Sequence, residues 1–319
     1  MPAVRAKRLV MTAALVVSAL SASCGGSDRA SAGGDGCGVV VTTDILGDIV
    51  ANVIGDQAAV EVLLDTGTDP HQFAPSAAQA AQLEEADLVI ANGLGLEEGL
   101  RSALESAEQA GVEVLEVAPE LDPLALSGAD EHEEQGDQGA YGGLDPHFWM
   151  DPLRVAEASG VVGAGIARAC GIDADSVARQ AESYRRQVLA VDAEVEAVLE
   201  AVPAERRALV TNHDTLGYLA ARYGFEVIGV VIPGGSTLAE PSAGELSRLA
   251  EEIERAGVPA VFAETTESVG LAEALAAETG SEVEVITLQT ESLGQAGSDA
   301  DTYLGLMQTT ARQIAGALG

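Results

Sequence analysis

Lysine is almost absent from this chain. The single lysine is Lys7, and no other follows it. A phosphate-binding P-loop needs a lysine that reaches the phosphates of a bound nucleotide, so the rest of the chain cannot contain one. Basic residues are scarce in general, because 16 lysines and arginines stand against 51 acidic residues, for a formal charge of −35. Such a surface repels nucleic acid and anionic lipid heads and attracts cations loosely, so we predict no nucleic-acid partner.

Aromatic side chains and long apolar runs are also rare. Only 3% of the residues are aromatic while 47% are hydrophobic, so the core has to be built mainly from alanine, valine and leucine. One apolar run, residues 9–20, follows the basic residues Arg5, Lys7 and Arg8. It is too short for a permanent membrane helix and has the pattern of a secretory signal over residues 1–23. No later run is long enough to cross a membrane.

The three cysteines fall into two groups. Cys24 follows small residues and precedes Gly-Gly-Ser, which resembles a bacterial lipoprotein cleavage site. We therefore expect an exported protein that contacts the cell membrane only through a lipid on Cys24, faces outside the cytoplasm, and has a flexible tether over 24–37. Ordinary secretion with cleavage nearby is the alternative. Cys37 and Cys170 can form one disulfide in an oxidising compartment, or remain buried free thiols.

Short apolar strands alternate with helices from residue 38 onward. We expect strands at 39–43, 60–64, 87–91, 112–117, 208–211, 225–232, 260–263 and 283–288. We expect helices at 44–54, 76–83, 96–110, 152–169, 216–223, 242–256 and 269–279, and a last one from residue 301; the caps are Asp44, Asp151, Ser242 and Asp301. This alternation predicts an α/β fold of mainly parallel sheets flanked by helices.

One long helix divides this pattern into two lobes. Residues 173–203 form a single apolar stripe with steps of three and four, made by Val177, Ala181, Tyr184, Val188, Val191, Val195, Val198 and Val202. A helix of about 30 residues spans ~45 Å, which is longer than one lobe is wide. We interpret it as a rigid backbone helix joining an N-terminal lobe, 38–172, to a C-terminal lobe, 204–319. A coiled-coil dimer is the alternative, but the flanking positions lack a clear charge code, so we predict a monomer.

Residues 118–143 interrupt the strand and helix pattern of the first lobe. The segment is rich in acids, contains His132 and has no apolar period. We therefore expect a mobile acidic loop.

Histidine is scarce as well, and its placement is informative. Two of the four histidines lie in a repeated frame, Asp69-Pro70-His71 and Asp145-Pro146-His147, each followed by an aromatic residue two places on. Proline restricts its own backbone and the residue before it, so each histidine is presented from a stiff loop. A simple turn is the alternative for either copy alone.

The predicted strands bring these histidines to comparable places. His71, His147 and His213 each follow a predicted strand, and Glu291 follows the last one. Ligands of open α/β sheets bind beyond the carboxyl ends of the strands. Three imidazoles and a carboxylate suit Zn²⁺, and suit Mn²⁺ less well.

Three aspartates adjoin these histidines, namely Asp69, Asp145 and Asp214. We expect them to orient the imidazole rings from behind. Helix capping is the alternative for Asp214.

These segments together resemble the ZnuA/TroA-like solute-binding lipoproteins of bacterial zinc and manganese ABC importers. The resembling pieces are TDPHQFAPS, the acidic loop, LDPHFWMDP, TNHDTLGYLAARYGFEVIGV and TESLGQAGSDADTYLGLMQTT, in order over 38–319. The resemblance implies two lobes, one rigid joining helix, and one metal in the cleft bound by His71, His147, His213 and Glu291. It departs from the family at Glu291, where members usually carry aspartate. It also departs in the loop 130–138, where zinc-type members often have many histidines.

The resemblance predicts a binding protein and not an enzyme. We expect it to capture Zn²⁺ outside the cytoplasm and deliver it to an ABC permease driven by a separate ATPase. His213 favours zinc, since manganese-type members carry a carboxylate there, and the sparse histidines of the acidic loop weaken that preference. The alternatives are a manganese-specific binding protein, a metal-dependent adhesin, and a zinc hydrolase with an open three-histidine site.

Overall fold

A computed structural model of the chain describes residues 36–126, 143–232, 234, 236–280 and 282–319. The predicted signal segment, Cys24 and nearly all of the predicted tether lie outside these residues, as does the 127–142 part of the acidic loop with His132. Residues 36–319 form one compact unit.

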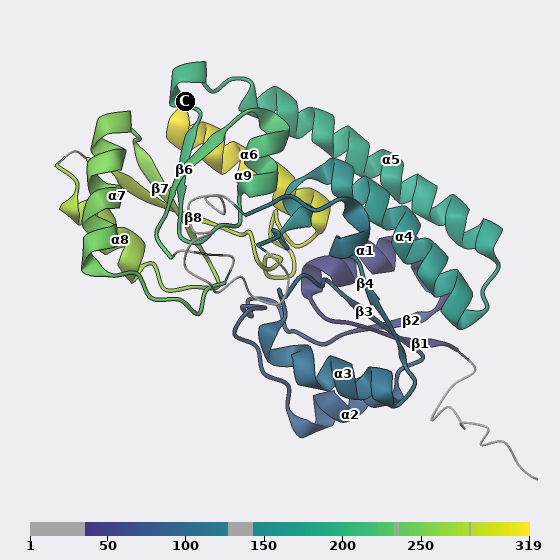
Figure 1. Cartoon of the computed structure of the whole chain (residues 1–319). Helices are drawn as coiled ribbons and strands as arrows, with labels where there is room; N and C mark the ends of the chain where they lie inside the picture. Colours follow the sequence, from purple (N-terminus) through teal and green to yellow (C-terminus); the bar gives the residue numbers. More distant parts are fainter. Residues whose placement is uncertain (1–35, 127–142, 233, 235, 281) are drawn as a thin grey trace, which may run out of the picture. The chain divides into compact units, whose positions relative to one another are not determined.

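The first half of this unit is a four-stranded parallel sheet covered by helices (Figure 1). Its strands are β1 (Gly38–Val41), β2 (Ala59–Val62), β3 (Leu88–Ala91) and β4 (Glu113–Glu116), in the order β2-β1-β3-β4. Its helices are α1 (Asp44–Ile54), α2 (Ala77–Glu85), α3 (Arg101–Gln109) and α4 (Pro152–Cys170), with 3-10 turns at Gly55–Gln57, Glu98–Leu100, Ala118–Leu121 and Phe148–Met150.

The strands of this sheet are apolar on both faces because helices cover both. Val39 and Val41 of β1 pack in one cluster with α1, α4 and α5, while Val40 between them packs in another with α2 and α3. Figure 1 shows α2 and α3 together on one side of the sheet and α1 and α4 on the other. This two-sided burial is why the strands read as continuous valine and leucine runs.

The second half repeats the design. Its strands are β5 (Ala208–Thr211), β6 (Glu226–Val230), β7 (Ala260–Glu264) and β8 (Glu284–Leu288), all parallel and in the order β6-β5-β7-β8. Its helices are α6 (Gly217–Tyr223), α7 (Ala243–Ala256), α8 (Gly270–Glu278) and α9 (Tyr303–Leu318), with a 3-10 turn at Ala204–Arg206. Val261 faces α7 and α8, while its neighbour Phe262 faces the core shared with α5 and α9. The prediction of two parallel α/β lobes is confirmed.

The long helix is α5, which covers Ala174–Leu199 and begins at the N-cap Asp173. Its 26 residues span ~39 Å. The predicted stripe is buried over almost its whole length, at Val177, Ala181, Tyr184, Val188, Val191 and Val195. One apolar cluster contains Val41 of the first sheet, Phe262 of the second and the stripe of α5 from Ala181 onward. Because this core is continuous, α5 packs against both halves, as expected for a rigid joining helix.

Helix caps show where the sequence was and was not sufficient. Asp151 caps α4 ahead of Pro152, and Ser242 caps α7 with Glu245 completing a capping box, both as predicted. The predictions of Asp44 and Asp301 as caps are wrong. Thr43 caps α1 and Thr302 caps α9, each with its hydroxyl accepting from the backbone N–H three residues on. The predicted helix 96–110 also begins late, because Glu98–Leu100 is a 3-10 turn and α3 starts at Arg101.

The displaced cap Asp44 has a different task. Its Oδ2 accepts hydrogen bonds from Ser292 Oγ at 2.6 Å and from Leu293 N at 3.0 Å. These residues follow Glu291 in the loop after β8. Asp44 therefore fastens the start of α1 to the loop that carries the candidate carboxylate ligand.

Cys37 and Cys170 are joined by a disulfide, with sulfurs 2.01 Å and Cα atoms 5.4 Å apart. The bond connects the residue before β1 to the last residue of α4. Among the helices that the structure describes, none combines the length and the apolar character needed to cross a bilayer.

Candidate metal centre

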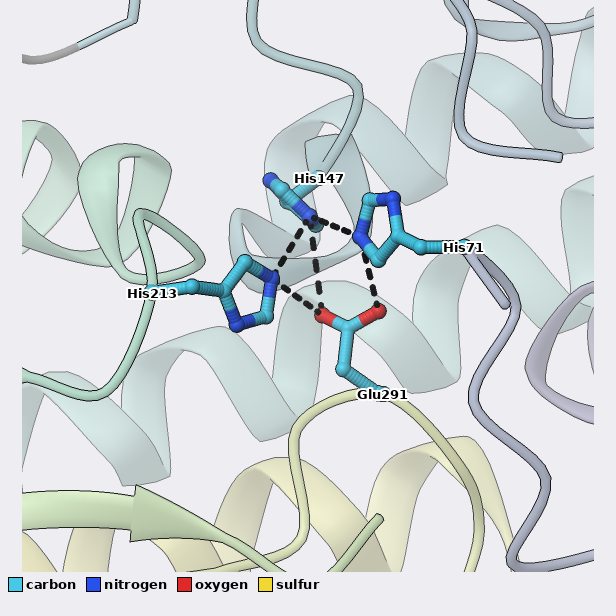
Figure 2. Close-up of side chains that lie close together, drawn as sticks. All are labelled: His71, His147, His213 and Glu291. Carbon is cyan, nitrogen blue, oxygen red and sulfur yellow. Dashed lines mark hydrogen bonds and ion pairs between the residues drawn. The ribbon is translucent and has the colours of Figure 1, made fainter. Parts of the chain in front are cut away.

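Four side chains from four loops meet in the interior of the compact unit (Figure 2). His71 lies in the loop after β2, His147 just before α4, His213 directly after β5 and Glu291 after β8. Each residue contributes one potential ligand atom, and these four atoms all lie within 4.8 Å of one another. None of the four residues is more than 2% exposed. The structure thus brings together the whole set of ligands expected from the sequence.

The distances within this group have the dimensions of a coordination sphere. His147 Nε2 lies 3.4 Å from His71 Nε2 and 3.3 Å from His213 Nε2. Glu291 Oε1 lies 3.6 Å from His147 Nε2 and 3.7 Å from His213 Nε2, and its Oε2 lies 3.8 Å from His71 Nε2. Four tetrahedral donors at about 2.0–2.2 Å from one ion are about 3.3–3.6 Å apart. The donor set and its spacing therefore fit a divalent transition metal.

His147 is held from behind by a carboxylate. Asp145 Oδ1 lies 2.7 Å from His147 Nδ1 and also accepts the backbone N–H of His147 at 2.9 Å. A ring that donates its Nδ1 proton to a carboxylate keeps the Nε2 lone pair free for a metal. This is the role that the sequence predicted for Asp145.

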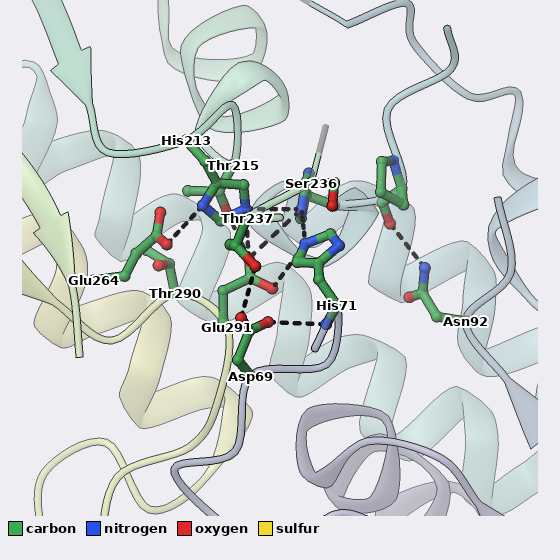
Figure 3. Close-up of polar contacts among 12 residues, drawn as sticks. Asp69, His71, Asn92, His213, Thr215, Ser236, Thr237, Glu264, Thr290 and Glu291 are labelled. Carbon is green, nitrogen blue, oxygen red and sulfur yellow. Dashed lines mark hydrogen bonds and ion pairs between the residues drawn. The ribbon is translucent and has the colours of Figure 1, made fainter. Parts of the chain in front are cut away.

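His213 has a comparable partner, but not the predicted one. Its Nδ1 lies 2.6 Å from Glu264 Oε2, so the carboxylate behind this ring is that of Glu264 instead of Asp214 (Figure 3). Glu264 is the last residue of β7 and is 51 positions from His213. The sequence analysis did not identify Glu264, because its contact with His213 depends on the order of strands in the sheet. The position of Glu264 at the end of a predicted strand was a signal that could have identified it.

His71 is held differently from the other two histidines. Asp69 Oδ1 accepts the backbone N–H of His71 at 2.8 Å, while Asp69 Oδ2 accepts from Thr237 Oγ1 at 2.7 Å (Figure 3). The Nδ1 of His71 meets no hydrogen-bond partner among the described residues. We predicted that Asp69 orients the ring of His71. In the structure Asp69 instead holds the backbone of its own loop and bonds Thr237, which belongs to the other half of the molecule.

Glu291 also has a partner that the sequence did not reveal. Thr215 Oγ1 donates to Glu291 Oε1 at 2.7 Å. Thr215 lies two residues after His213, so one short loop supplies one ligand and orients another. The second oxygen, Oε2, has no hydrogen-bond partner among the described residues. Since Oε1 lies 3.6 Å from His147 Nε2 and Oε2 lies 3.8 Å from His71 Nε2, both oxygens face the histidines, and the carboxylate can offer one or both to an ion.

Comparison with known proteins agrees with this geometry. Residues 39–317 match the family described as zinc-uptake complex component A periplasmic, ZnuA. The chain belongs to the ZnuA family. It is 30% identical over 300 residues to the zinc-binding protein TroA of Treponema pallidum, covering 92% of each chain. It is 28% identical over 295 residues to the manganese-binding lipoprotein MntA of Halalkalibacterium halodurans, covering 92% of this chain and 93% of the relative.

The fold is also similar to that of solved structures. The periplasmic zinc-binding protein TroA of Treponema pallidum superposes with a TM-score of 0.79 at 29% identity, over 89% of this chain and 99% of that one. As a ZnuA-family member, the chain is a metal-binding solute-binding protein and not an enzyme. The alternative of a zinc hydrolase is therefore wrong.

Burial and mutual contact shift the pKa values of all four side chains in this ZnuA-type site. Burial raises the pKa of Glu291 to about 8. Burial, together with the neighbouring imidazoles, holds the pKa of His71 and His147 well below 6.5. Burial also lowers the pKa of His213, but the charge and hydrogen bond of Glu264 outweigh it and raise that pKa to about 9. A divalent cation at the centre would favour neutral imidazoles and an ionised carboxylate together.

Proposed function

We propose that this protein captures one Zn²⁺ ion with His71, His147, His213 and Glu291 as its ligands. The observation that carries the proposal is the convergence of four buried donor atoms within 4.8 Å of one another. Four interacting donors of this kind, shielded from water, are costly to bury without an ion. Their spacing supports a metal bound directly by four side chains of the protein.

The choice of zinc rests on the donor atoms. Three imidazoles suit Zn²⁺, whereas Mn²⁺ prefers oxygen ligands. Manganese is the second candidate, and one observation favours it: both oxygens of Glu291 face the histidines. A carboxylate that binds through both oxygens raises the coordination number above four. The relatives TroA and MntA are described as zinc-binding and manganese-binding respectively, which supports both candidates.

The proposed biological role is delivery of this ion to a membrane transporter. Membership of the ZnuA family supports a role as the exported component of an uptake complex. In this proposal residues 1–23 direct export, Cys24 carries a lipid, and 24–37 tether a monomer whose lobes are 38–172 and 204–319, joined by 173–203. The partners are an ABC permease and its ATPase. An adhesin is the remaining alternative, and it would bind the same ion without a transporter.

Metal competition tests the proposal directly. The mature protein, stripped of metal by a chelator under mild denaturation and refolded, is titrated with Zn²⁺ and with Mn²⁺. Trp149 is the only tryptophan, and its ring centre lies 5.3 Å from that of His147, so its fluorescence reports occupancy. We expect one Zn²⁺ per chain and displacement of Mn²⁺ by Zn²⁺. Absence of stoichiometric binding of either ion would refute the function, and displacement of Zn²⁺ by equimolar Mn²⁺ would reverse the metal assignment.

A further inference from the structure

Glu264 occupies a central place in the second half of the molecule. It ends β7, which lies between β5 and β8 in the sheet. β5 leads into the loop of His213 and β8 leads into the loop of Glu291. Since these strands are parallel, their carboxyl ends lie at one edge of the sheet, and Glu264 stands between the two loops that carry ligands.

Among the described residues, the side chain of Glu264 has one hydrogen-bond partner. Its Oε2 lies 2.6 Å from His213 Nδ1, and both side chains are at most 2% exposed. Its other oxygen, Oε1, meets no hydrogen-bond partner among the described residues. A carboxylate placed in the interior with so few partners is expensive in free energy. The fold therefore keeps Glu264 there for its contact with the ring of His213.

That contact determines which nitrogen of His213 can bind a metal. When Nδ1 donates its proton to Glu264, Nε2 carries the lone pair, and Nε2 is the atom that lies 3.3 Å from His147 Nε2. A charge-assisted hydrogen bond in a buried site is strong and directional. It fixes the ring plane and makes the imidazole a better electron donor.

We propose that Glu264 is the positioning residue of the metal centre, acting through His213 on an ion that it does not touch. The inference rests on the proposed function and extends it to a residue outside the ligand set. The carboxylate orients His213, selects its tautomer and places a negative charge one imidazole away from the cation. Glu264 thereby contributes to affinity for ions that bind imidazole well.

The test compares Glu264→Gln and Glu264→Ala with the unaltered protein. Loss of a carboxylate behind a metal-bound histidine typically weakens binding ~10–100-fold. We expect both variants to bind Zn²⁺ that much more weakly in competition with a chromophoric chelator. Co²⁺ serves as a spectroscopic probe, and its visible d–d bands should shift in both variants because the ring of His213 turns. Glu284→Gln, at the exposed start of β8, is the matched control for removing one negative charge.

The outcomes separate the inference from the proposed function. If the unaltered protein binds neither Zn²⁺ nor Co²⁺ stoichiometrically, the proposed function itself fails. If it binds them and Glu264→Gln retains full affinity with an unchanged Co²⁺ spectrum, the inference is overturned. If Glu264→Gln binds normally and only Glu264→Ala is impaired, the negative charge behind His213 is not needed for binding, and the inference is again overturned. Melting curves of the metal-free variants establish that each one is folded.

Discussion

Asp69 and Asp145 stand at the same position in the two copies of the Asp-Pro-His frame. Each accepts a hydrogen bond from the backbone N–H of the histidine two residues later, at 2.8 and 2.9 Å. Asp145 also bonds the ring of His147, whereas Asp69 instead reaches Thr237 in the other half of the molecule. The repeated sequence thus builds the same turn twice, with two different sets of tertiary contacts.

The difference shows what a short motif can and cannot specify. Aspartate followed by proline closes the turn by a contact between near neighbours in sequence, so both copies have it. The remaining capacity of each carboxylate is used by whatever the fold places beside it. One loop therefore supplies a histidine held at its ring, and the other supplies a histidine held through its backbone.

Removal of a histidine from either loop is expected to have the largest effect on Zn²⁺ affinity. Structural zinc sites bind with about 10–16 kcal/mol in total, so one of four ligands accounts for roughly 3 kcal/mol and a loss of ~100-fold or more in affinity. We expect His71→Ala and His147→Ala to reach this level alike, because both rings donate Nε2 to the same group. Competition titration with Zn²⁺ measures it. A much smaller loss in His71→Ala would mean that the first loop contributes no ligand.

Substitution of the two aspartates is expected to affect Zn²⁺ affinity differently in the two loops. Asp145→Asn removes the charge behind the ring of His147 and should weaken Zn²⁺ binding ~10–100-fold. Asp69→Asn keeps an oxygen that accepts the backbone N–H of His71, and residue 69 does not bond the ring of a histidine. The loss of Zn²⁺ affinity in this variant should therefore stay below about 10-fold. The same titration measures both. Equal losses in the two variants would show that the contacts of the two aspartates are equivalent for binding.

The pH dependence of stability should distinguish the same pair in the metal-free protein. Burial raises the pKa of Asp145 to about 7, from an ordinary value of 3.8. A folded-state pKa above the unfolded one gives stability that is present below pH 3.8 and is lost as the pH rises through 7. Asp145→Asn lacks this loss, so its Tm relative to the unaltered protein should increase between pH 4 and pH 7, by a few degrees.

Asp69 provides the contrasting case. Burial raises its pKa, but hydrogen bonds with Glu267 and Thr237, together with the charge of His71, outweigh burial and lower the pKa below 3.8. The stability it contributes is therefore fully present above pH 3.8 and is lost only at lower pH. The Tm of Asp69→Asn relative to the unaltered protein should therefore rise as the pH falls below 3.8, a range in which Glu267, whose pKa burial and Asp69 raise to about 7, stays protonated. Thermal melts in chelator from pH 2.5 to 7 check both variants, and a Tm difference for Asp69→Asn that does not change below pH 3.8 would contradict the assignment.

The smallest expected effect concerns the contact between the first loop and the other half. Thr237→Val removes the hydroxyl that donates to Asp69 and leaves every ligand in place. Loss of one hydrogen bond to a charged group costs about 1.5–3 kcal/mol at most. We expect Zn²⁺ to dissociate a few-fold faster, measured by stopped-flow transfer to a chelator. Thr287→Val, at an exposed position of β8, is the control and should leave the rate unchanged.

Much of the architecture was predictable because it depends on local patterns. The valine and leucine runs of β1, β3 and β5 and the stripe of α5 repeat with the period of their secondary structure, so they could be read without tertiary information. The caps failed where two candidates stood side by side. Thr43 precedes Asp44 and Thr302 follows Asp301, and the sequence gives no reason to prefer one over the other.

The site divided along the same line. His71 and His147 were identifiable from a repeated local frame, and Glu291 from its place after the last strand. Glu264, Thr215 and Thr237 were not identified, because their partners are 51, 76 and 168 positions away. Such contacts follow from the order of strands in a sheet, and that order cannot be predicted from any single segment of the sequence.

The disulfide has a consequence for the order in which the metal site is assembled. It closes a ring of chain between Cys37 and Cys170, which are 133 positions apart. Both His71 and His147 lie within that ring, while His213 and Glu291 lie outside it. Closing so long a ring restricts the unfolded chain by about 5 kcal/mol in the chain-entropy description. Oxidation would thus narrow the conformations open to the segment that carries half of the ligands before any ion arrives, whereas in a reduced chain that segment would stay unrestricted.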